Sequence, residues 1–427
     1  MTLSWLQIVR LGFVQMALGA VVVLTTSTLN RLMVVEFALP AILPGALVGL
    51  HYGIQLSRPR WGFTSDTGGN RTVWIIGGMI ALALGGLLAA VGVTLFATSY
   101  IWALIVSLAA YALIGIGVGA SGTSLLALLA TATAANRRAA AATITWLMMI
   151  FGIAMTAGIA GQFLDPYSPE RLLAVVAVVT GLAVLLTFVA VWGIERKVAI
   201  RPASDAPPFL EGLKEIWAEP KARNFTLFVF LSMNAYFMQE LILEPFAGLV
   251  FGLTPGQSTA LSGMQNGGVF LGMLTVGIMA TGLKIGSLRM WVIGGCLGSA
   301  IALTCIAAAG AGWLALPLSA LVVGLGFFNG MFAVAAIGAM MALASEGQEQ
   351  REGTRMGLWG AAQAIAAGFG GLTGAAAVDI MRGLQDDPTA FGTVFLAEAA
   401  LFVAAAGMAL HVMKQENATQ AVVIAGE

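Results

Sequence analysis

The chain has 427 residues, of which 59% are hydrophobic and 9% are charged, and its mean hydropathy is +0.93. A soluble domain carries about 25% charged residues, so this composition excludes a water-soluble enzyme and indicates a chain dissolved in lipid. Its 20 basic and 20 acidic residues cancel, which leaves no electrostatic signature for nucleic-acid binding. Cys296 and Cys305 lie in one apolar run, where we expect buried thiols rather than a disulfide or a metal site.

A helix needs about 20 apolar residues to cross a bilayer, and twelve such stretches follow one another along the chain. The first six are Ile8–Leu29, Phe37–Gln55, Thr72–Ala97, Ile101–Ala130, Ala139–Phe163 and Leu172–Ile194. The second six are Phe225–Leu249, Ser258–Gly282, Leu288–Ala311, Leu314–Ala344, Gly353–Met381 and Phe391–Val412. Because the first stretch is long and eleven more follow, we expect it to span the membrane rather than to be a cleaved signal peptide. The predicted fold class is an all-α membrane protein.

A long polar segment, Glu195–Arg223, separates the two sets of six and contains four prolines. We therefore predict an N-terminal six-helix bundle at 1–194, a linker at 195–223, a C-terminal six-helix bundle at 224–413 and a tail at 414–427. An offset of 213 residues supports a duplicated unit. The matches at this offset are Arg138 and Trp146 with Arg351 and Trp359, and Gly158 and Gly161 with Gly371 and Gly374.

Lysine and arginine placement predicts the orientation, because cytoplasmic loops of membrane proteins are enriched in both. With a cytoplasmic N-terminus, only Arg31, Arg171 and Arg382 fall in outer loops, and all other basic residues fall on the cytoplasmic side. We therefore expect both termini, the linker and the tail to be cytoplasmic.

The loop after the second stretch, Gly62-Phe-Thr-Ser-Asp66-Thr-Gly-Gly69-Asn-Arg71, resembles the loop signature of the major facilitator superfamily. Its glycines allow a tight turn, and Asp66 is expected to cap the third helix or to meet a basic residue across a cytoplasmic gate. Thr67 and Asn70 depart from the basic residues that are usual there, and the counterpart Gly282–Arg289 is degenerate. The alternative interpretation is a simple hydrophilic turn.

The seventh stretch carries Gln239, Glu240, Glu244 and Pro245. Glu240 and Glu244 are four residues apart and share a helix face, while Pro245 leaves the carbonyl of Leu241 without its helical donor. A charged side chain at membrane depth costs roughly 3 kcal/mol or more, so two acids on one face need protonation, water or a bound partner. The alternative is that Glu244 lies at the outer interface, where the helix is nearly over.

Three strings point to a particular family: Gln239–Gly252, Gly256–Leu261 and Gly353–Ala366. They resemble the PucC family of photosynthetic bacteria, also called the bacteriochlorophyll delivery family, a branch of the major facilitator superfamily that includes PucC-type and LhaA-type light-harvesting assembly factors. The resemblance implies two six-helix bundles around a central cavity, in the bacterial inner (intracytoplasmic) membrane. It implies bacteriochlorophyll as cargo and no other cofactor. The implied partners are membrane lipids, bacteriochlorophyll synthase and light-harvesting antenna polypeptides.

Chlorin magnesium accepts one axial ligand, and the candidates for it are Glu240 and Glu244, with Gln239 beside them, and His51. His51 and His411 are otherwise expected to be interfacial. Arg355, Trp359 and Gln363 share one face of the eleventh stretch, where Trp359 could stack on a flat ring. The alternative for this trio is an interfacial arginine with a belt tryptophan. Glu398 is a further buried acid without an evident partner.

Nothing in the sequence suggests an enzyme of prenyl transfer, which uses paired aspartate-rich clusters to hold magnesium diphosphate. Only Asp386 and Asp387 are adjacent aspartates, and they are not repeated. We therefore expect a non-enzymatic factor for bacteriochlorophyll delivery and light-harvesting complex assembly. Two alternatives remain. One is a proton-coupled transporter with Glu240, Glu244 or Glu398 as proton carrier, and the other is a scaffold that binds the synthase and antenna polypeptides.

Overall fold

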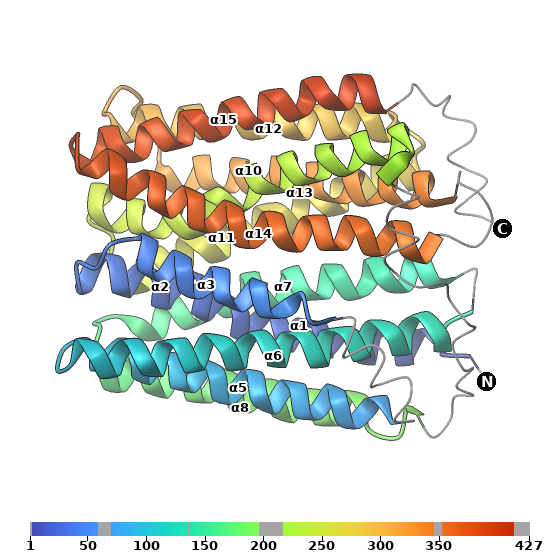
Figure 1. The fold of residues 1–427 in the computed structure, drawn as a ribbon, viewed down its shortest axis with the longest axis horizontal. Helices are drawn as coiled ribbons and strands as arrows, with labels where there is room; N and C mark the ends of the chain where they lie inside the picture. The colour runs from blue at the N-terminus through green and yellow to red at the C-terminus, as the bar shows by residue number, and fades with distance from the viewer. Residues whose placement is uncertain (1, 59–69, 135–136, 196–216, 346–351, 414–427) are drawn as a thin grey trace. The chain divides into compact units, whose positions relative to one another are not determined.

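The computed structural model describes residues 2–58, 70–134, 137–195, 217–345 and 352–413, and the described residues form helices and turns without a β-strand (Figure 1). The first half contains α1 (Trp5–Val23) continued by η1 (Leu24–Thr28), α2 (Leu29–Arg31) and η2 (Leu32–Glu36), then α3 (Ile42–Gln55), α5 (Arg71–Leu95), α6 (Tyr100–Ala132), α7 (Arg138–Leu164) and α8 (Pro169–Val191). The second half contains α10 (Pro220–Phe251), α11 (Pro255–Val276) continued by η5 (Gly277–Gly282), α12 (Leu288–Gly310), α13 (Leu318–Ser345), α14 (Glu352–Arg382) and α15 (Asp387–Val412).

Within the described ranges, ten helices are long and apolar enough to cross a membrane. The two other predicted stretches also form helices. Helix α3 has 14 residues, which is about 21 Å at 1.5 Å per residue. Helix α11 carries polar side chains such as Gln257, Gln265 and Asn266 along its length, which lowers its hydropathy.

The predicted limits of the first two stretches are wrong. The first helix continues past Leu29 to Glu36, and the second begins at Ile42 rather than Phe37. The sequence Asn30-Arg31 looked like a loop, but both side chains are buried and bonded inside the protein. The second helix starts late because Pro40 keeps the preceding residue out of helical conformation.

Residue contacts divide the chain into two compact units, which are described separately. The first unit is 1–202 with 240–266, and the second is 203–239 with 267–427. Helices α10 and α11 therefore each contribute to both units. The bundle boundary predicted at 195–223 stays a prediction.

Glycines allow the helices within each unit to pack closely. In the first unit, an added Cβ at Gly117 would lie 2.5 Å from the Leu82 nitrogen, and one at Gly152 would lie 2.5 Å from the Met16 carbonyl oxygen. In the second unit, Cβ atoms at Gly268 and Gly272 would lie within 2.3 Å of carbonyl oxygens of α13. These distances leave no room for a side chain, as expected for membrane helices that associate through small residues.

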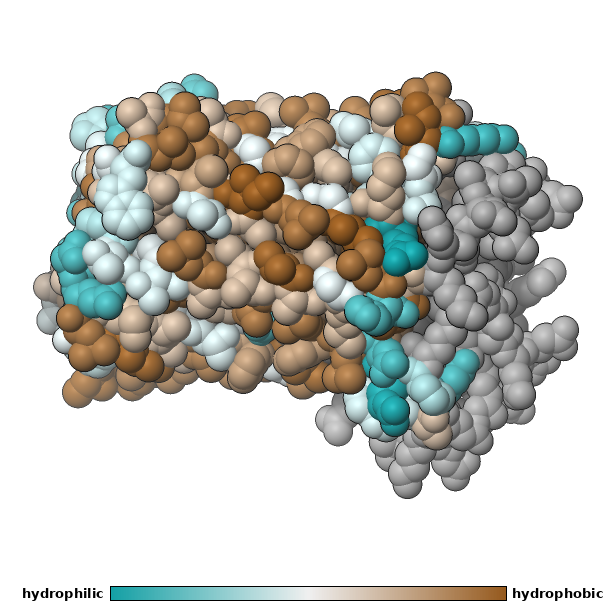
Figure 2. Space-filling view, turned by 90° about the horizontal axis from the view of Figure 1, so that it is seen from above, coloured by the Kyte–Doolittle hydropathy of each residue, from teal (hydrophilic) through white to brown (hydrophobic). Residues whose placement is uncertain are grey.

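The outward faces of the helices are apolar. Large aliphatic side chains such as Leu182 on α8 and Ile301 on α12 are 59% and 64% exposed. On the face drawn in Figure 2, hydrophobic residues cover the middle length of the helices, and hydrophilic residues gather toward the helix ends. Such surfaces need a lipid solvent, and the chain is an all-α, multi-span membrane protein.

Candidate functional site

The first membrane helix is interrupted by a π-helical turn, η1, and ends in a second one, η2. This stretch carries a run of buried polar side chains, namely Thr25, Thr26, Ser27, Thr28, Asn30 and Arg31. π-helical turns widen the backbone and are frequent at functional sites. Here the carbonyl of Thr25 accepts a hydrogen bond of 2.7 Å from the buried Tyr111 hydroxyl of α6, so a second helix supports the interruption.

Pro245 and Asn30 form a matched pair. As predicted, Pro245 lies inside α10 and leaves the Leu241 carbonyl without its helical donor. The Asn30 side chain supplies the missing bond, since its Nδ2 donates to the Leu241 oxygen over 2.6 Å. The hydroxyls of Ser27 and Ser262 lie 2.9 Å apart, and those of Thr28 and Thr259 lie 3.1 Å apart. The interrupted helix is thereby tied to α10 and α11.

Glu244 lies inside this polar cluster. Its side chain is 2% exposed, and neither carboxyl oxygen has a hydrogen-bond partner among the described residues. The hydroxyls of Ser27, Ser258 and Ser262 and the charge of Arg31 lie around it without completing a bond. Helix α10 starts at Pro220 and continues past Glu244 to Phe251, and the interfacial interpretation of Glu244 stays a prediction. Within the described ranges, the carboxyl group therefore has polar neighbours but no completed hydrogen bond.

The neighbouring predicted residues on α10 have different surroundings. Glu240 is half-buried, and the Thr26 hydroxyl lies beside its carboxyl group. Gln239 is 1% exposed and belongs to the second unit, where its Oε1 has no partner among the described residues. Glu240 and Glu244 share the first unit, whereas Gln239 is grouped with the second.

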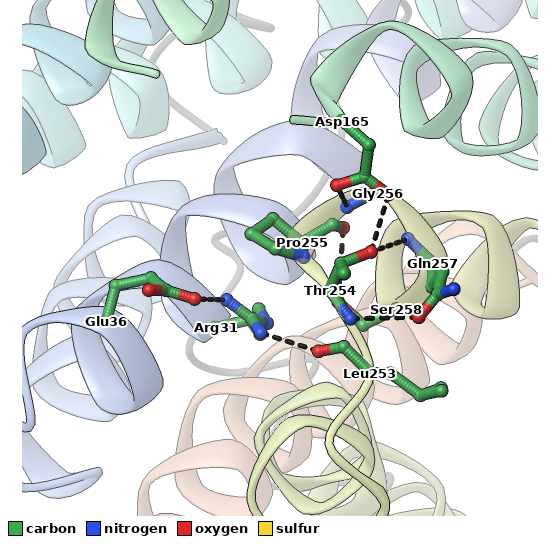
Figure 3. Close-up of polar contacts among 9 residues, drawn as sticks. All are labelled: Arg31, Glu36, Asp165, Leu253, Thr254, Pro255, Gly256, Gln257 and Ser258. Carbon is green, nitrogen blue, oxygen red and sulfur yellow. Dashed lines mark hydrogen bonds and ion pairs between the residues drawn. The ribbon is translucent and has the colours of Figure 1, made fainter. Parts of the chain in front are cut away.

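Arg31 is a site residue that the sequence did not reveal, because it was expected in an outer loop. It is 2% exposed and lies within the helix. Its guanidinium forms an ion pair with Glu36 and donates to the Leu253 carbonyl over 2.7 Å (Figure 3). Gly248 makes room for it, since a Cβ there would lie 3.3 Å from the guanidinium. The only hint in the sequence was a cation and an anion five residues apart in an apolar run.

Asp165, at the end of α7, holds the start of α11. Its carboxylate accepts from the Thr254 hydroxyl and, over 3.1 Å, from the Gly256 backbone nitrogen (Figure 3). An acid at a helix N-terminus satisfies free amides and matches the helix dipole. Gly256 is required here, because a Cβ would lie 2.3 Å from the Gly161 carbonyl oxygen.

The loop signature between α3 and α5 is described only at its end. Gly62, Asp66 and Gly69 lie outside the described residues. Arg71 opens α5, where the backbone nitrogens of Arg71 and Thr72 donate to the Glu195 carboxylate over 2.8 and 2.9 Å. Among the described residues, the acid that caps this helix is therefore Glu195, and the role predicted for Asp66 stays a prediction.

The remaining candidates are dispersed. His51 is buried, and its Nε2 lies 2.8 Å from the Gln55 side-chain nitrogen. His411 is exposed near the end of α15, with Nδ1 2.9 Å from the Gly407 oxygen. The side chains of Arg355 and Trp359 lie outside the described residues, and Gln363 is half-buried. Glu398 is fully buried in the second unit. The described structure brings together Glu240, Glu244 and Pro245, but not the other candidates.

Comparisons with solved structures identify the fold. The nucleoside transporter NupG aligns with a TM-score of 0.66 at 14% identity, covering 96% of this chain and 99% of that chain. A bacterial homologue of the human drug peptide transporters PepT1 and PepT2 aligns with a TM-score of 0.71 at 14% identity, covering 96% and 98%. At such low identity the likeness concerns the fold alone.

Comparisons of sequence identify the family. A protein named bacteriochlorophyll synthase 44.5 kDa chain, from Rhodobacter capsulatus, is 68% identical over the whole of both chains. Protein PucC of Cereibacter sphaeroides is 30% identical over 89% of this chain and 85% of its own length. The family model described as PUCC protein matches residues 28–417. The resemblance found in the sequence is confirmed, and the chain belongs to the PucC family.

Proposed function

We propose that the protein is a non-enzymatic factor of the bacterial inner (intracytoplasmic) membrane that holds and delivers bacteriochlorophyll during assembly of light-harvesting complexes. The observation that carries the proposal is the Glu244 carboxyl group. It is buried, hydroxyl groups surround it, and it has no hydrogen-bond partner among the described residues of this PucC-family chain. The name of the R. capsulatus relative, bacteriochlorophyll synthase 44.5 kDa chain, associates this family with bacteriochlorophyll.

The side chains around Glu244 have the chemistry to hold the magnesium ion of such a pigment. When bound, such a pigment supplies a magnesium ion that accepts one oxygen or nitrogen ligand, and carboxylate oxygens are preferred by this hard cation. Glu244 would hold the metal, while the hydroxyls of Ser27, Ser258 and Ser262 would orient its carboxyl group or donate to polar substituents of the ring. Arg31 lies near enough to stabilise an ionised Glu244. Glu240, half-buried one turn away, is the second candidate ligand.

The non-enzymatic part of the proposal rests on how the chain uses its paired aspartates. Asp386 precedes the first turn of α15, and Asp387 forms an ion pair with Arg382 over 2.7 Å. Both residues are thus accounted for by the start of a helix rather than by a diphosphate site. The relative named as a synthase chain is therefore interpreted as a protein that accompanies the synthesis, with the synthase and the antenna polypeptides as partners.

Pigment occupancy tests the proposal. The protein is purified in mild detergent from pigment-producing cells that lack their own copy, and its absorption spectrum and bound chlorins are measured. We expect wild-type protein to retain bacteriochlorophyll, and Glu244→Gln to show about tenfold lower occupancy, the change produced by a loss of roughly 1.4 kcal/mol in binding free energy. Glu170→Gln is the matched control, because Glu170 is an exposed acid in the first turn of α8.

If the purified protein never retains chlorin but co-purifies with the synthase or antenna polypeptides, pigment binding is contradicted. That result would favour the alternative function, a scaffold that binds these proteins. The fold shared with solved transporters favours one further candidate, a proton-coupled transporter. Uptake of a small solute into reconstituted vesicles that depends on a pH gradient and is lost in Glu240→Gln would favour that function.

The proposed orientation places both termini in the cytoplasm, because nearly all lysines and arginines then fall in cytoplasmic segments. Reporter fusions after residue 427 and in the turn between α12 and α13 test it. A reporter active only in the cytoplasm should work in the first fusion and fail in the second. The opposite pattern would overturn the orientation without touching the pigment proposal.

A further inference from the structure

The second unit contains a buried acid that the proposed function does not use. Glu398 lies midway along α15, its side chain has 0% exposure, and neither carboxyl oxygen has a hydrogen-bond partner among the described residues. A carboxylate at membrane depth is unfavourable unless it is paired or neutral. A position that needed only packing would be filled at lower cost by an apolar side chain. Glu398 therefore calls for an explanation in its own unit.

Contacts along α12 show which residues of α12 and α13 lie at the same height along the helix axes as Glu398. Helices α12 and α15 are antiparallel, since Arg289 donates to the Leu410 carbonyl and Gly392 faces Ala307. This register places Glu398 beside residue 301 of α12. Ser299 of α12 bonds Asn329 of α13, so Asn329 and Glu398 differ in level by two residues, or about 3 Å along the axis.

An aromatic pair gives the same register independently. The rings of Phe332 on α13 and Phe402 on α15 lie 6.2 Å apart. Helices α13 and α15 are parallel, because both run opposite to α12. Asn329 precedes Phe332 by one helical turn, and Glu398 precedes Phe402 by one turn. The acid and the amide are therefore neighbours on the same side of the aromatic pair.

The unpartnered atoms at this level are complementary. The Ser299 hydroxyl donates to Asn329 Oδ1 over 2.8 Å, and Asn329 Nδ2 is buried without a partner among the described residues. The amide nitrogen can donate to an ionised carboxylate, and after rotation of the amide its oxygen can accept from a protonated carboxyl group. Ser299 can serve either orientation, because a hydroxyl both donates and accepts. The amide and hydroxyl thus suit both protonation states of Glu398.

Few charged or titratable groups on the described parts of the neighbouring helices could influence this acid. On α12 these are Arg289, which donates to Leu410 at the far end of α15, and the thiols of Cys296 and Cys305. On α14 they are Asp379 and Arg382, close to the end of the helix. The described part of α13 contributes none. No cation in these ranges lies at the level of Glu398.

We propose that Glu398, Asn329 and Ser299 form a proton-binding site in the second unit, at which the Glu398 carboxyl group takes up and releases one proton. The proton moves between the carboxyl group and solvent, and no covalent bond other than the O–H bond forms or breaks. This site is separate from the Glu244 cluster in the first unit and does not depend on pigment binding.

Infrared spectroscopy of the full-length protein in lipid nanodiscs, prepared without pigment, tests the site. The carbonyl band of protonated carboxylic acids is recorded over a pH series in potassium buffer. We expect a component equivalent to one carboxyl group per chain that disappears as the pH rises and is absent from Glu398→Gln. Glu244→Gln should retain it. Asn329→Leu should retain a pH-dependent component at a shifted frequency, because the amide proposed to bond the acid is gone.

Three results would overturn the proposal. The pH-dependent component could be unchanged in Glu398→Gln, a Glu398-dependent component could persist at every pH, or sodium at constant pH could remove it, which would make the site a sodium site. If Glu398→Gln does not give a monodisperse protein, the shift in Asn329→Leu carries the test alone, and an unshifted band then contradicts the site. None of these outcomes bears on pigment occupancy, so failure here and failure of the proposed function are distinguishable.

Discussion

The two units surround their buried acids, Glu244 and Glu398, with different polar groups. In the first unit, Glu244 lies among hydroxyls and an arginine, on helices interrupted by Pro245 and by π-helical turns. In the second unit, Glu398 lies on the uninterrupted helix α15, with one amide and one hydroxyl at its level. Interrupted helices expose backbone groups that other polar groups can use. The first arrangement therefore offers several polar groups to the proposed pigment, and the second offers one carboxyl group to the proposed proton.

The difference also concerns stability. The polar groups of the first unit bond one another across helices, so removal of one leaves a buried partner unpaired. The second unit contains a buried carboxyl group that has no hydrogen-bond partner among the described residues. Removing this group therefore leaves no other buried group without a partner. Substitutions should therefore destabilise the first unit more than the second.

The largest effect is expected for Glu36→Gln, which leaves the buried Arg31 charge without its ion pair. Removal of one partner of a fully buried pair costs about 3–5 kcal/mol, and the partial exposure of Glu36 reduces this to roughly 2–3 kcal/mol of unfolding free energy. The measurement is the unfolding midpoint in detergent. Arg31→Met combined with Glu36→Gln should be less destabilised than Glu36→Gln alone. A double variant destabilised by the sum of the losses in Glu36→Gln and Arg31→Met alone would show that the pair contributes no coupling.

A comparable effect is expected for Gly256→Ala, because the new Cβ would lie 2.3 Å from the Gly161 carbonyl and 2.5 Å from the Asp165 carboxylate. Overpacking of this kind costs about 1–3 kcal/mol. Gly181→Ala on α8 is the control, since a Cβ there meets nothing within 4 Å, and alanine is favoured in helices. The two variants should move the melting temperature in opposite directions. A neutral Gly256→Ala would mean that α7 and α11 do not pack this closely.

The sequence predicted the helices well, because the apolar runs between polar segments are long and need lipid as solvent. It failed around Asn30 and Arg31, where a helix continues through polar residues. Local pattern treats such residues as a loop, whereas their partners are the Leu241 and Leu253 carbonyls, more than 200 positions away. Hydropathy contains no information about that distant pairing.

The candidate site was predictable in part for the same reason. Pro245 and the acids four residues apart are local features, so the freed Leu241 carbonyl and the unusual position of Glu244 could be read from α10 alone. The hydroxyls and Arg31 that surround Glu244 come from other helices. Likewise, the Glu195 carboxylate caps α5 although it lies 123 or more residues away in the sequence. A prediction limited to the loop signature considers only Asp66 as the capping acid.

A smaller effect is expected for Asn30→Leu, which leaves the Leu241 carbonyl at the proline interruption without a donor. Membrane hydrogen bonds contribute about 0.6 kcal/mol on average, and an unsatisfied buried group costs about 1–3 kcal/mol. We therefore expect about 1 kcal/mol of destabilisation. Asn266→Leu is the matched control, because Asn266 bonds the Ser262 carbonyl one turn back in its own helix. Equal losses in both variants would show that the interruption in α10 needs no donor.

The smallest effect is expected for Glu398→Leu, and its sign separates the two units. Leucine removes a buried carboxyl group that has no partner among the described residues, and it fills a similar volume between Phe395 and Phe402. Replacement of a buried polar group by an apolar one is often neutral or stabilising, so the unfolding midpoint should stay unchanged or rise, by less than about 1 kcal/mol. A loss of more than about 2 kcal/mol, the cost of leaving a bonded partner unsatisfied, would mean that Glu398 is tied into its unit as firmly as Arg31 is. In that case the Glu398 carboxyl group would have a structural role. The two acids would then differ in the side chains that surround them and not in the ligands that they bind.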